Sequence, residues 1–244
     1  KMKIVFQILF VSFPIFLLNQ TINFEILFGI NFSGRLNYVL TILWILVLMN
    51  SINFIDNMDG FAAINSSFIC IALTALSFVF NQNYLADVSF VLLFTILGFT
   101  IYNFPPARIY MGDSGSLFIG FIFGFISILF DWNPTGQSYL YSSIAPIFLF
   151  FTIPLLDFST VFIHRIKNNI SPTTGGTDHI SHRLLNQGLS VKSVLLLFSL
   201  LNIFIFLLLA LTIAFESMSV IIFLIYLIII LTLFIKFQKL EPLN

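Results

Sequence analysis

Amide and carboxylate side chains recur at three-residue spacing in the stretch that ends at Gly60. Asn50, Asn53 and Asp56 close one apolar stretch, and Asp59 and Gly60 precede the next one. Residues three apart share a face of a helix, so we expect the first three side chains to line up before the helix breaks. Carboxylates this close to hydrocarbon are costly and typically mark a substrate, proton or ion site. The alternative is a set of ordinary helix-end residues solvated by interfacial water.

A second polar cluster runs from Asn103 to Ser116, with two adjacent prolines near its start. The prolines predict the end of one helix, and the small residues around Asp113 predict the start of the next. The free N–H groups of a helix start, together with a carboxylate, can hold a metal–phosphate group. The alternative is that Asp113 occupies the N-cap position and has no other role. The additional presence of Asn103, Arg108 and two glycines favours function.

A third cluster contains His179, His182 and Arg183 in a polar loop. A zinc site would need further ligands, and the one other histidine stands apart at a helix end. Two imidazoles and a guanidinium can instead bind phosphate oxygens through charge-assisted hydrogen bonds. The alternative is a solvated loop. Asp157, in the preceding apolar stretch, is either functional or paired with Arg165 or another basic residue.

The composition indicates a membrane protein. The 244 residues are 59% hydrophobic and 8% charged, with a mean hydropathy of +1.07, whereas soluble domains carry about 25% charged residues. The net charge is zero and the basic residues are scattered, which argues against nucleic-acid binding. The single cysteine, Cys70, excludes an internal disulfide and a cysteine metal site. We see no repeat or linker, so we expect residues 1–244 to form one domain.

Eight apolar stretches are each near the roughly 20 residues that a membrane-crossing helix needs. The sequence therefore predicts an all-α, polytopic membrane protein with about eight transmembrane helices. The stretches cover residues 4–18, 38–55, 61–80, 88–104, 114–130, 139–163, 191–214 and 218–237.

Eight crossings would place every lysine and arginine except Arg35 on one side of the membrane. Basic loops face the cytosol, so that side is expected to be cytosolic and to carry all three polar clusters. A transporter with intramembrane carboxylates is a rival interpretation. It would place ionisable residues along a path between the two faces, or show inverted repeats, and we find neither in the sequence.

The three clusters, in this order, resemble the motifs of the polyprenyl-phosphate N-acetylhexosamine-1-phosphate transferases. The resemblance covers essentially the whole chain. The matching motifs are Asn50-x-x-Asn53-x-x-Asp56-x-x-Asp59-Gly60, the segment from Asn103 to Ser116, Pro154-x-x-Asp157 with Arg165, and the histidine loop.

The resemblance implies transfer of a sugar-1-phosphate from a UDP-sugar to undecaprenyl or another polyprenyl phosphate, with release of UMP. Mg²⁺ is the implied cofactor, with Mn²⁺ as an alternative. The loop reads His-Ile-Ser-His, without the three consecutive histidines of the muramoyl-pentapeptide branch, so GlcNAc-1-phosphate is the expected group. The implied setting is a bacterial cell membrane and the first membrane step of cell-wall or surface polysaccharide synthesis. A homodimer, and the choice between direct attack and a covalent intermediate, stay open.

The resemblance also implies roles for individual residues. Asp113, with Asn53, would bind the metal, and Asp56 and Asp59 would shape the nucleoside and metal pocket. The remaining implied site residues contact substrate. Tyr110 would stack on uracil. The diphosphate or sugar would be held by His179, His182 and Arg183, and the substrate pocket would include Asn50 and Asn103.

Two departures from the family pattern stand out. Asn57 and Phe61 replace a usual glycine and leucine. In addition, the segment from Lys3 to Gln7 resembles the helix start that follows an adjacent Asp-Asp pair in the family. We therefore expect the chain to begin just after that pair, with about two further helices before it, and a catalytically inactive, truncated paralogue is the second alternative.

Overall fold

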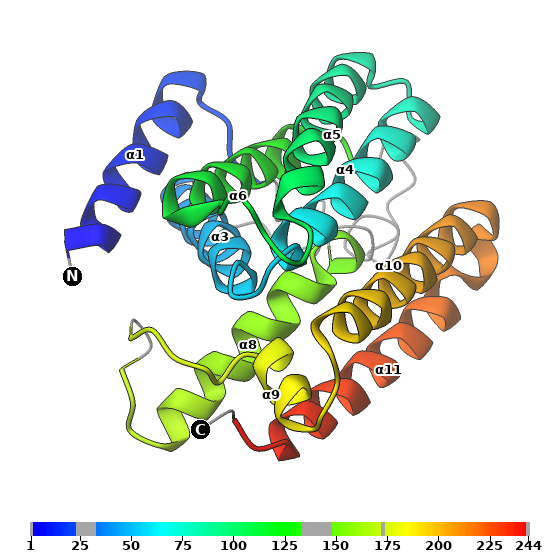
Figure 1. Ribbon diagram of the computed structural model, residues 1–244. Coiled ribbons are helices and arrows are strands. Elements are labelled where there is room, and N and C mark those ends of the chain that lie inside the picture. Colours follow the sequence, from blue (N-terminus) through cyan, green and yellow to red (C-terminus); the bar gives the residue numbers. More distant parts are fainter. Residues whose placement is uncertain (1, 23–32, 133–147, 172–173, 243–244) are drawn as a thin grey trace.

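The computed structural model describes residues 2–22, 33–132, 148–171 and 174–242, and these residues are predominantly helical, without a strand (Figure 1). Their elements, in chain order, are α1 (Met2–Leu18), α3 (Gly34–Ile55), α4 (Phe61–Val79), α5 (Asn83–Asn103), α6 (Gly112–Leu129), α8 (Thr152–Lys167), α9 (Ile180–Asn186), α10 (Val191–Ala214), η1 (Glu216–Met218) and α11 (Ser219–Lys239).

The eight long helices correspond to the eight predicted apolar stretches. Among the described residues, six helices are long and apolar enough to cross a membrane, and α1 is a shorter apolar helix. The predicted all-α polytopic fold is therefore confirmed. For α8 the prediction was wrong at its end, because the helix continues past Ile163 to Lys167. Arg165 lies in the last turn of this helix and has a buried partner, described below. Residues 139–147 of the predicted stretch lie outside the described part.

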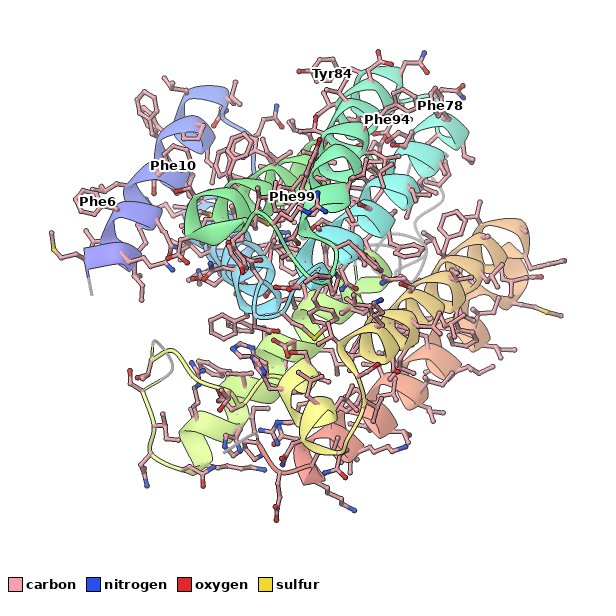
Figure 2. The ribbon with its side chains drawn as sticks, in the orientation of Figure 1. Phe6, Phe10, Phe78, Tyr84, Phe94 and Phe99 are labelled. Carbon is pink, nitrogen blue, oxygen red and sulfur yellow. The ribbon has the colours of Figure 1, made fainter. Side chains whose placement is uncertain are left out.

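Large apolar side chains cover the outside of the helix bundle. Figure 2 shows Phe6 and Phe10 along α1, and Phe78, Tyr84 and Phe94 on α4 and α5. All five are exposed. An aqueous surface rarely carries contiguous apolar area of this kind, whereas hydrocarbon solvates it. The outward aromatic side chains agree with a bundle that sits in lipid.

Helices α3 and α6 run antiparallel and pack closely because α6 presents glycines to α3. A Cβ atom added at Gly120 would lie 2.6 Å from Cα of Met49, and one added at Gly124 would lie 2.9 Å from Cγ2 of Ile45. Small residues allow this approach between helices in a membrane, where packing rather than hydrophobic burial drives association.

Hydrogen bonds between α3 and α6 lie on both sides of the glycine contacts and agree with the same alignment of the two helices. At one end, Nε1 of Trp44 donates to Oγ of Ser127 over 2.8 Å. At the other end, Nδ2 of Asn53 donates to Oγ of Ser116 over 2.9 Å. The glycine contacts therefore fix a register that brings Asn53 to the first turn of α6.

Gly120→Ala is expected to destabilise the protein, because the added methyl group meets backbone atoms of α3 that cannot rotate away. Overpacking of this kind costs about 1–3 kcal/mol. Gly98→Ala is the matched control, since no atom lies within 4 Å of a Cβ at that helical position. Thermal unfolding in detergent should show a lower midpoint for Gly120→Ala and an equal or higher one for Gly98→Ala. Equal midpoints for the two variants would contradict the close packing.

Candidate active site

A cavity of about 730 Å³ lies among α1, α3, α6, α8 and the segment that precedes α9. Its wall combines polar groups with apolar side chains from α3 and α8. The polar lining residues are Lys3, Gln7, Asn50, Asn53, Asp56, Asn57, Asp113, Thr174 and His179. The expectation that Asn50, Asn53 and Asp56 share a face is confirmed, because all three side chains reach this one cavity.

Asp113 stands at the centre of a polar cluster in the cavity wall. Its Oδ2 accepts from Nζ of Lys3 over 2.8 Å, and its Oδ1 accepts from Nδ2 of Asn53 over 2.9 Å. Nζ of Lys3 also donates to Oδ1 of Asn53 over 3.3 Å. A cationic group thus sits between one carboxylate oxygen and one amide oxygen that come from different helices.

Asp113 does not occupy the N-cap position. Helix α6 begins at Gly112, Met111 is the N-cap residue, and no side chain caps the helix. The Asp113 carboxylate faces Asn53 and Lys3 across the cavity. Gly112 lines the cavity with φ at 64°, a left-handed conformation that side chains other than glycine rarely adopt. The capping alternative is therefore not what the structure shows.

The residues of this cluster fit a Mg²⁺ ion. Carboxylate and amide oxygens are the hard ligands that Mg²⁺ prefers, and Mg²⁺ commonly takes only one or two carboxylates while substrate phosphates and water complete its coordination. Oδ2 of Asp113 and Oδ1 of Asn53 already converge on one cation, the Lys3 ammonium. Among the described residues, no group of three or more His, Cys, Asp or Glu side chains could hold a metal. In a site with these two protein oxygens, water or substrate phosphate oxygens would complete the coordination.

Asp56 follows the last residue of α3 and is partly buried beside the same cluster. Burial raises the pKa of its carboxyl group to about 6; a hydrogen bond from the backbone of Gly112 opposes the rise, and the negative charge of Asp113 adds to it. Near neutral pH this group therefore exchanges a proton more readily than an ordinary aspartate.

The raised pKa of Asp56 predicts a pH-dependent stability. The unfolded chain releases this proton at a lower pH than the folded protein, so the folded state binds more protons in between. The free energy of unfolding should therefore fall as the pH rises toward about 6. Thermal unfolding in metal-free detergent should show this fall in the wild type and lose it in Asp56→Asn. The exposed carboxylate variant Asp87→Asn should keep it; a pH profile of Asp56→Asn parallel to the wild type would contradict the assignment.

His179 lines the same cavity and contacts Asp157 of α8. Nδ1 of His179 lies 2.8 Å from Oδ2 of Asp157, and Oδ1 of Asp157 accepts from the backbone N–H of Ile180 over 2.7 Å. The ring also packs edge-on against Phe54, with centroids 5.4 Å apart. Asp157 therefore pairs with the histidine loop and not with Arg165.

Arg165 pairs with Asp178 in a two-pronged ion pair. Nε and Nη2 of Arg165 donate to Oδ2 and Oδ1 of Asp178, both over 2.7 Å, and both side chains are largely buried. Gly176 lies close against the pair, since a Cβ there would come within 2.8 Å of Oδ1 of Asp178. This pair therefore holds the segment that carries His179 against α8.

Five predicted site residues do not line the cavity: Asp59, Asn103, Tyr110, His182 and Arg183. Asn103 is buried and ties two loops together, since its Oδ1 accepts from the N–H of Gly60 and its Nδ2 donates to the carbonyl of Ile109. Oδ2 of Asp59 accepts from a backbone N–H of the same loop, that of Ala107. Tyr110 is 76% exposed. Asn103 and Asp59 thus make hydrogen bonds to the backbone of the loops that follow α3 and α5. The contact of Tyr110 with uracil stays a prediction.

Arg183 lies in α9, apart from the cavity lining. Its side chain is fully buried, and its guanidinium donates to the backbone carbonyls of Asp178, Phe237 and Leu240. Arg183 and His182 thus belong to helix α9, where the sequence predicts a loop. Arg183 joins this helix to the end of α11 and does not line the cavity. His182 is half-buried, and burial, together with the neighbouring His179, lowers its pKa below the ordinary value. A neutral His182 contributes no positive charge for an anion.

The sequence interpretation misses several members of the site. Gln7, Asn57 and Thr174 line the cavity, and Lys3 and Ser116 contact Asn53. From the sequence, Lys3 is only part of a predicted helix start. Its position at the head of an apolar stretch is nevertheless a signal, because a long basic side chain there can reach a neighbouring helix end. Ser116 was noted only as a small residue near a helix start. Both contact Asn53. These contacts depend on how α1 and α6 pack against α3.

Comparisons with known proteins agree with the motifs. The family described as Glycosyl transferase family 4 matches residues 1–131. The chain is 34% identical over 197 residues to a probable undecaprenyl-phosphate N-acetylglucosaminyl 1-phosphate transferase of Bacillus subtilis (strain 168), covering 81% of this chain and 54% of that protein. It is 32% identical over 174 residues to a decaprenyl-phosphate N-acetylglucosaminephosphotransferase of Mycobacterium leprae (strain TN), covering 65% and 44%.

A third relative belongs to a different branch. A phospho-N-acetylmuramoyl-pentapeptide-transferase of Moorella thermoacetica is 36% identical over 91 residues, covering 37% of this chain and 29% of that protein. The chain spans about half the length, or less, of these relatives. The family match covers more than half of the chain, and it includes the Asn/Asp signature and Asp113. The chain therefore belongs to glycosyl transferase family 4.

Proposed function

We propose that this protein transfers N-acetylglucosamine-1-phosphate from UDP-GlcNAc to a polyprenyl phosphate, giving the polyprenyl-diphosphate sugar and UMP. The relatives with the longest matches carry names that state a GlcNAc-1-phosphate transferase acting on undecaprenyl or decaprenyl phosphate. The proposed reaction is Mg²⁺-dependent. The proposed location is a bacterial cell membrane, with the site on the cytosolic side, where we expect the basic loops.

One observation carries the proposal. A single cavity joins the oxygen pair of Asp113 and Asn53 to His179, although these residues come from α3, α6 and the segment before α9. Phosphoryl transfer depends on positioning and on neutralising charge more than on a strong base. An oxygen pair suited to a divalent cation, a lysine and an imidazole around one space meet that requirement.

The residues of the chain divide the task. When bound, Mg²⁺ would neutralise charge on the diphosphate oxygens. Asp113 and Asn53 would hold it, and Lys3, whose ammonium group now contacts both, would be available to phosphate oxygens. His179, once protonated at Nε2, would donate to a diphosphate or sugar oxygen. An acceptor phosphate oxygen attacks the phosphorus that carries the sugar, and the bond to the UMP oxygen breaks.

The apolar part of the cavity wall suits a lipid acceptor. Leu43 and Leu46 of α3 and Phe158 and Phe162 of α8 line the same cavity as the polar cluster. A polyprenyl phosphate has an anionic head and a hydrocarbon chain, so it needs polar and apolar walls in continuity. A water-soluble acceptor would gain nothing from these four side chains.

The test is a transfer assay with the complete natural protein in nanodiscs. UDP-GlcNAc, undecaprenyl phosphate and Mg²⁺ should yield UMP and a lipid-linked sugar diphosphate in equal amounts. Chelation of the metal should stop both products. UDP-GalNAc and UDP-MurNAc-pentapeptide serve as comparison donors.

Two outcomes would contradict the proposal. Release of UDP in place of UMP would show transfer of the sugar alone. Absence of both products under all donors, in a protein that stays folded, would favour a catalytically inactive paralogue.

A further inference from the structure

We propose that Asp157 is a positioning residue that fixes the tautomer of His179 and leaves its Nε2 atom for the cavity. Only the expected effect of Asp157 on catalysis rests on the proposed function. Its geometric content concerns two side chains of this chain and is testable without any transfer reaction.

The contact between the two residues lies in the protein interior. The side chains of Asp157 and His179 are 1% and 8% exposed, and Nδ1 of His179 lies 2.8 Å from Oδ2 of Asp157. The other carboxylate oxygen is occupied, since Oδ1 accepts from the N–H of Ile180 over 2.7 Å. Each oxygen of Asp157 thus faces one nitrogen of the histidine segment.

The direction of these hydrogen bonds is determined by chemistry. An ionised carboxylate can only accept hydrogen bonds, and a backbone N–H can only donate. Nδ1 of His179 must therefore carry a proton, and in the neutral ring Nε2 keeps its lone pair. Since Nδ1 faces Asp157 and the ring lines the cavity, Nε2 is the nitrogen that remains for a ligand.

Neighbouring groups restrict the ring further. Phe54 packs edge-on against it, with an interplanar angle of 88°, and the ring centroid of His182 lies 6.2 Å away. Asp178 is the other nearby carboxylate, and it is bound to Arg165 through both oxygens. Of the two carboxylates, Asp157 is the one that contacts the imidazole.

In the proposed reaction, this arrangement gives His179 two uses. The neutral ring can accept a proton at Nε2, and the resulting imidazolium, balanced by Asp157, can donate to a phosphate oxygen. The opposite tautomer would place a fixed N–H in the cavity and could not accept. Asp157 would act only through His179, and it does not line the cavity itself.

Asp157→Asn reverses the tautomer while keeping the size of the side chain. The N–H of Ile180 still needs an acceptor, so the amide oxygen of asparagine must face it. The amide NH₂ group then faces Nδ1, which becomes an acceptor and leaves the proton on Nε2. The substitution should therefore keep the orientation of the His179 ring and move its proton from Nδ1 to Nε2.

The first measurement uses diethyl pyrocarbonate, which acylates imidazole nitrogens that have a free lone pair, with mass spectrometry to resolve the three histidines. In wild type, His179 should react at neutral pH. In Asp157→Asn its rate should fall at least about tenfold, as expected when the reactive tautomer is lost. His164, which contacts Asn168, is the internal reference and should react equally in both proteins.

Thr160→Val is the matched control on the same helix. Thr160 is buried and its hydroxyl bonds only within α8, to the carbonyl of Leu156. This variant perturbs the interior of α8 without touching His179, so the His179 rate should not change. An unchanged rate in Asp157→Asn, or an equal fall in Thr160→Val, would overturn the inference.

The second measurement is kcat/KM for UDP-GlcNAc in a double-mutant cycle. Asp157→Asn alone should lower it by about a hundredfold, within the range of acid–base contributions. In a His179→Gln background, the same substitution should change it less than about twofold, because its effect passes through the lost imidazole. A purely structural role would give equal losses in both backgrounds and would overturn the inference.

The outcomes separate this inference from the proposed function. Absence of transfer in the wild type would contradict the function and leave the acylation rates as a valid test of the tautomer. Transfer in the wild type with no effect of Asp157→Asn would overturn the inference alone. If Asp157→Asn does not fold, ¹⁵N-histidine NMR of the wild type decides: a proton on Nδ1 of neutral His179 is expected, and one on Nε2 would overturn it.

Discussion

Asp113→Asn is expected to lower sugar-1-phosphate transfer by at least about a hundredfold and to leave the fold intact, because it removes a charge that acts on the transition state. Asparagine retains an oxygen that can accept from Nδ2 of Asn53. It loses the negative charge that now attracts Lys3 and that would hold a divalent cation. The ion pair itself is solvent-exposed and contributes little to stability.

Two measurements separate metal binding from folding in this variant. Mn²⁺ binding followed by electron paramagnetic resonance should weaken in Asp113→Asn, and the thermal unfolding midpoint without metal should stay near that of wild type. Asp87→Asn is the matched control, an exposed carboxylate of α5 away from the cavity. It should bind Mn²⁺ and turn over like wild type.

Near-normal turnover of Asp113→Asn at limiting Mg²⁺ would contradict the metal assignment. A fall in unfolding midpoint as large as the fall in activity would also contradict it, because Asp113 would then serve the fold. The test therefore depends on whether Asp113→Asn lowers activity much more than it lowers the unfolding midpoint.

The helices were largely predictable because their cause is local. A stretch of about 20 apolar residues has to become a helix in hydrocarbon, where each backbone polar group needs an internal partner. The three-residue spacing of Asn50, Asn53 and Asp56 likewise predicts one face, and all three line the cavity. The sequence places the N-cap at Asp113, two positions after the observed N-cap at Met111, because cap geometry depends on the turn at Gly112.

The partners of the charged side chains were not predictable, because tertiary contacts decide them. Arg165 and Arg183 both lie in or beside the polar loop region of the sequence, yet one binds Asp178 and the other binds backbone carbonyls at the end of α11. The sequence leaves several candidate partners for Asp157, and in the structure its partner is His179. No spacing rule in the chain distinguishes these arrangements.

Arg165→Met is expected to destabilise the protein by about 3–5 kcal/mol, because it leaves the carboxylate of Asp178 buried without its cation. Burial alone would raise the pKa of Asp178, and the hydrogen bonds and charge of Arg165 outweigh it and hold that pKa below the ordinary value. Methionine fills a similar volume and offers no donor. Thermal unfolding in detergent should show the loss, and Arg35→Met, at an exposed arginine, should not.

Two further variants identify the cause as the unpaired charge. Arg165→Lys keeps a positive charge but cannot form the two-pronged contact, so its midpoint should lie between those of wild type and Arg165→Met. Combining Arg165→Met with Asp178→Leu removes both charges and should recover much of the lost stability, since apolar replacement of a complete buried pair is often neutral. Failure of the double variant to exceed Arg165→Met would contradict this account. Transfer should remain impaired even where stability returns, because the pair also fastens the segment that carries His179 to α8.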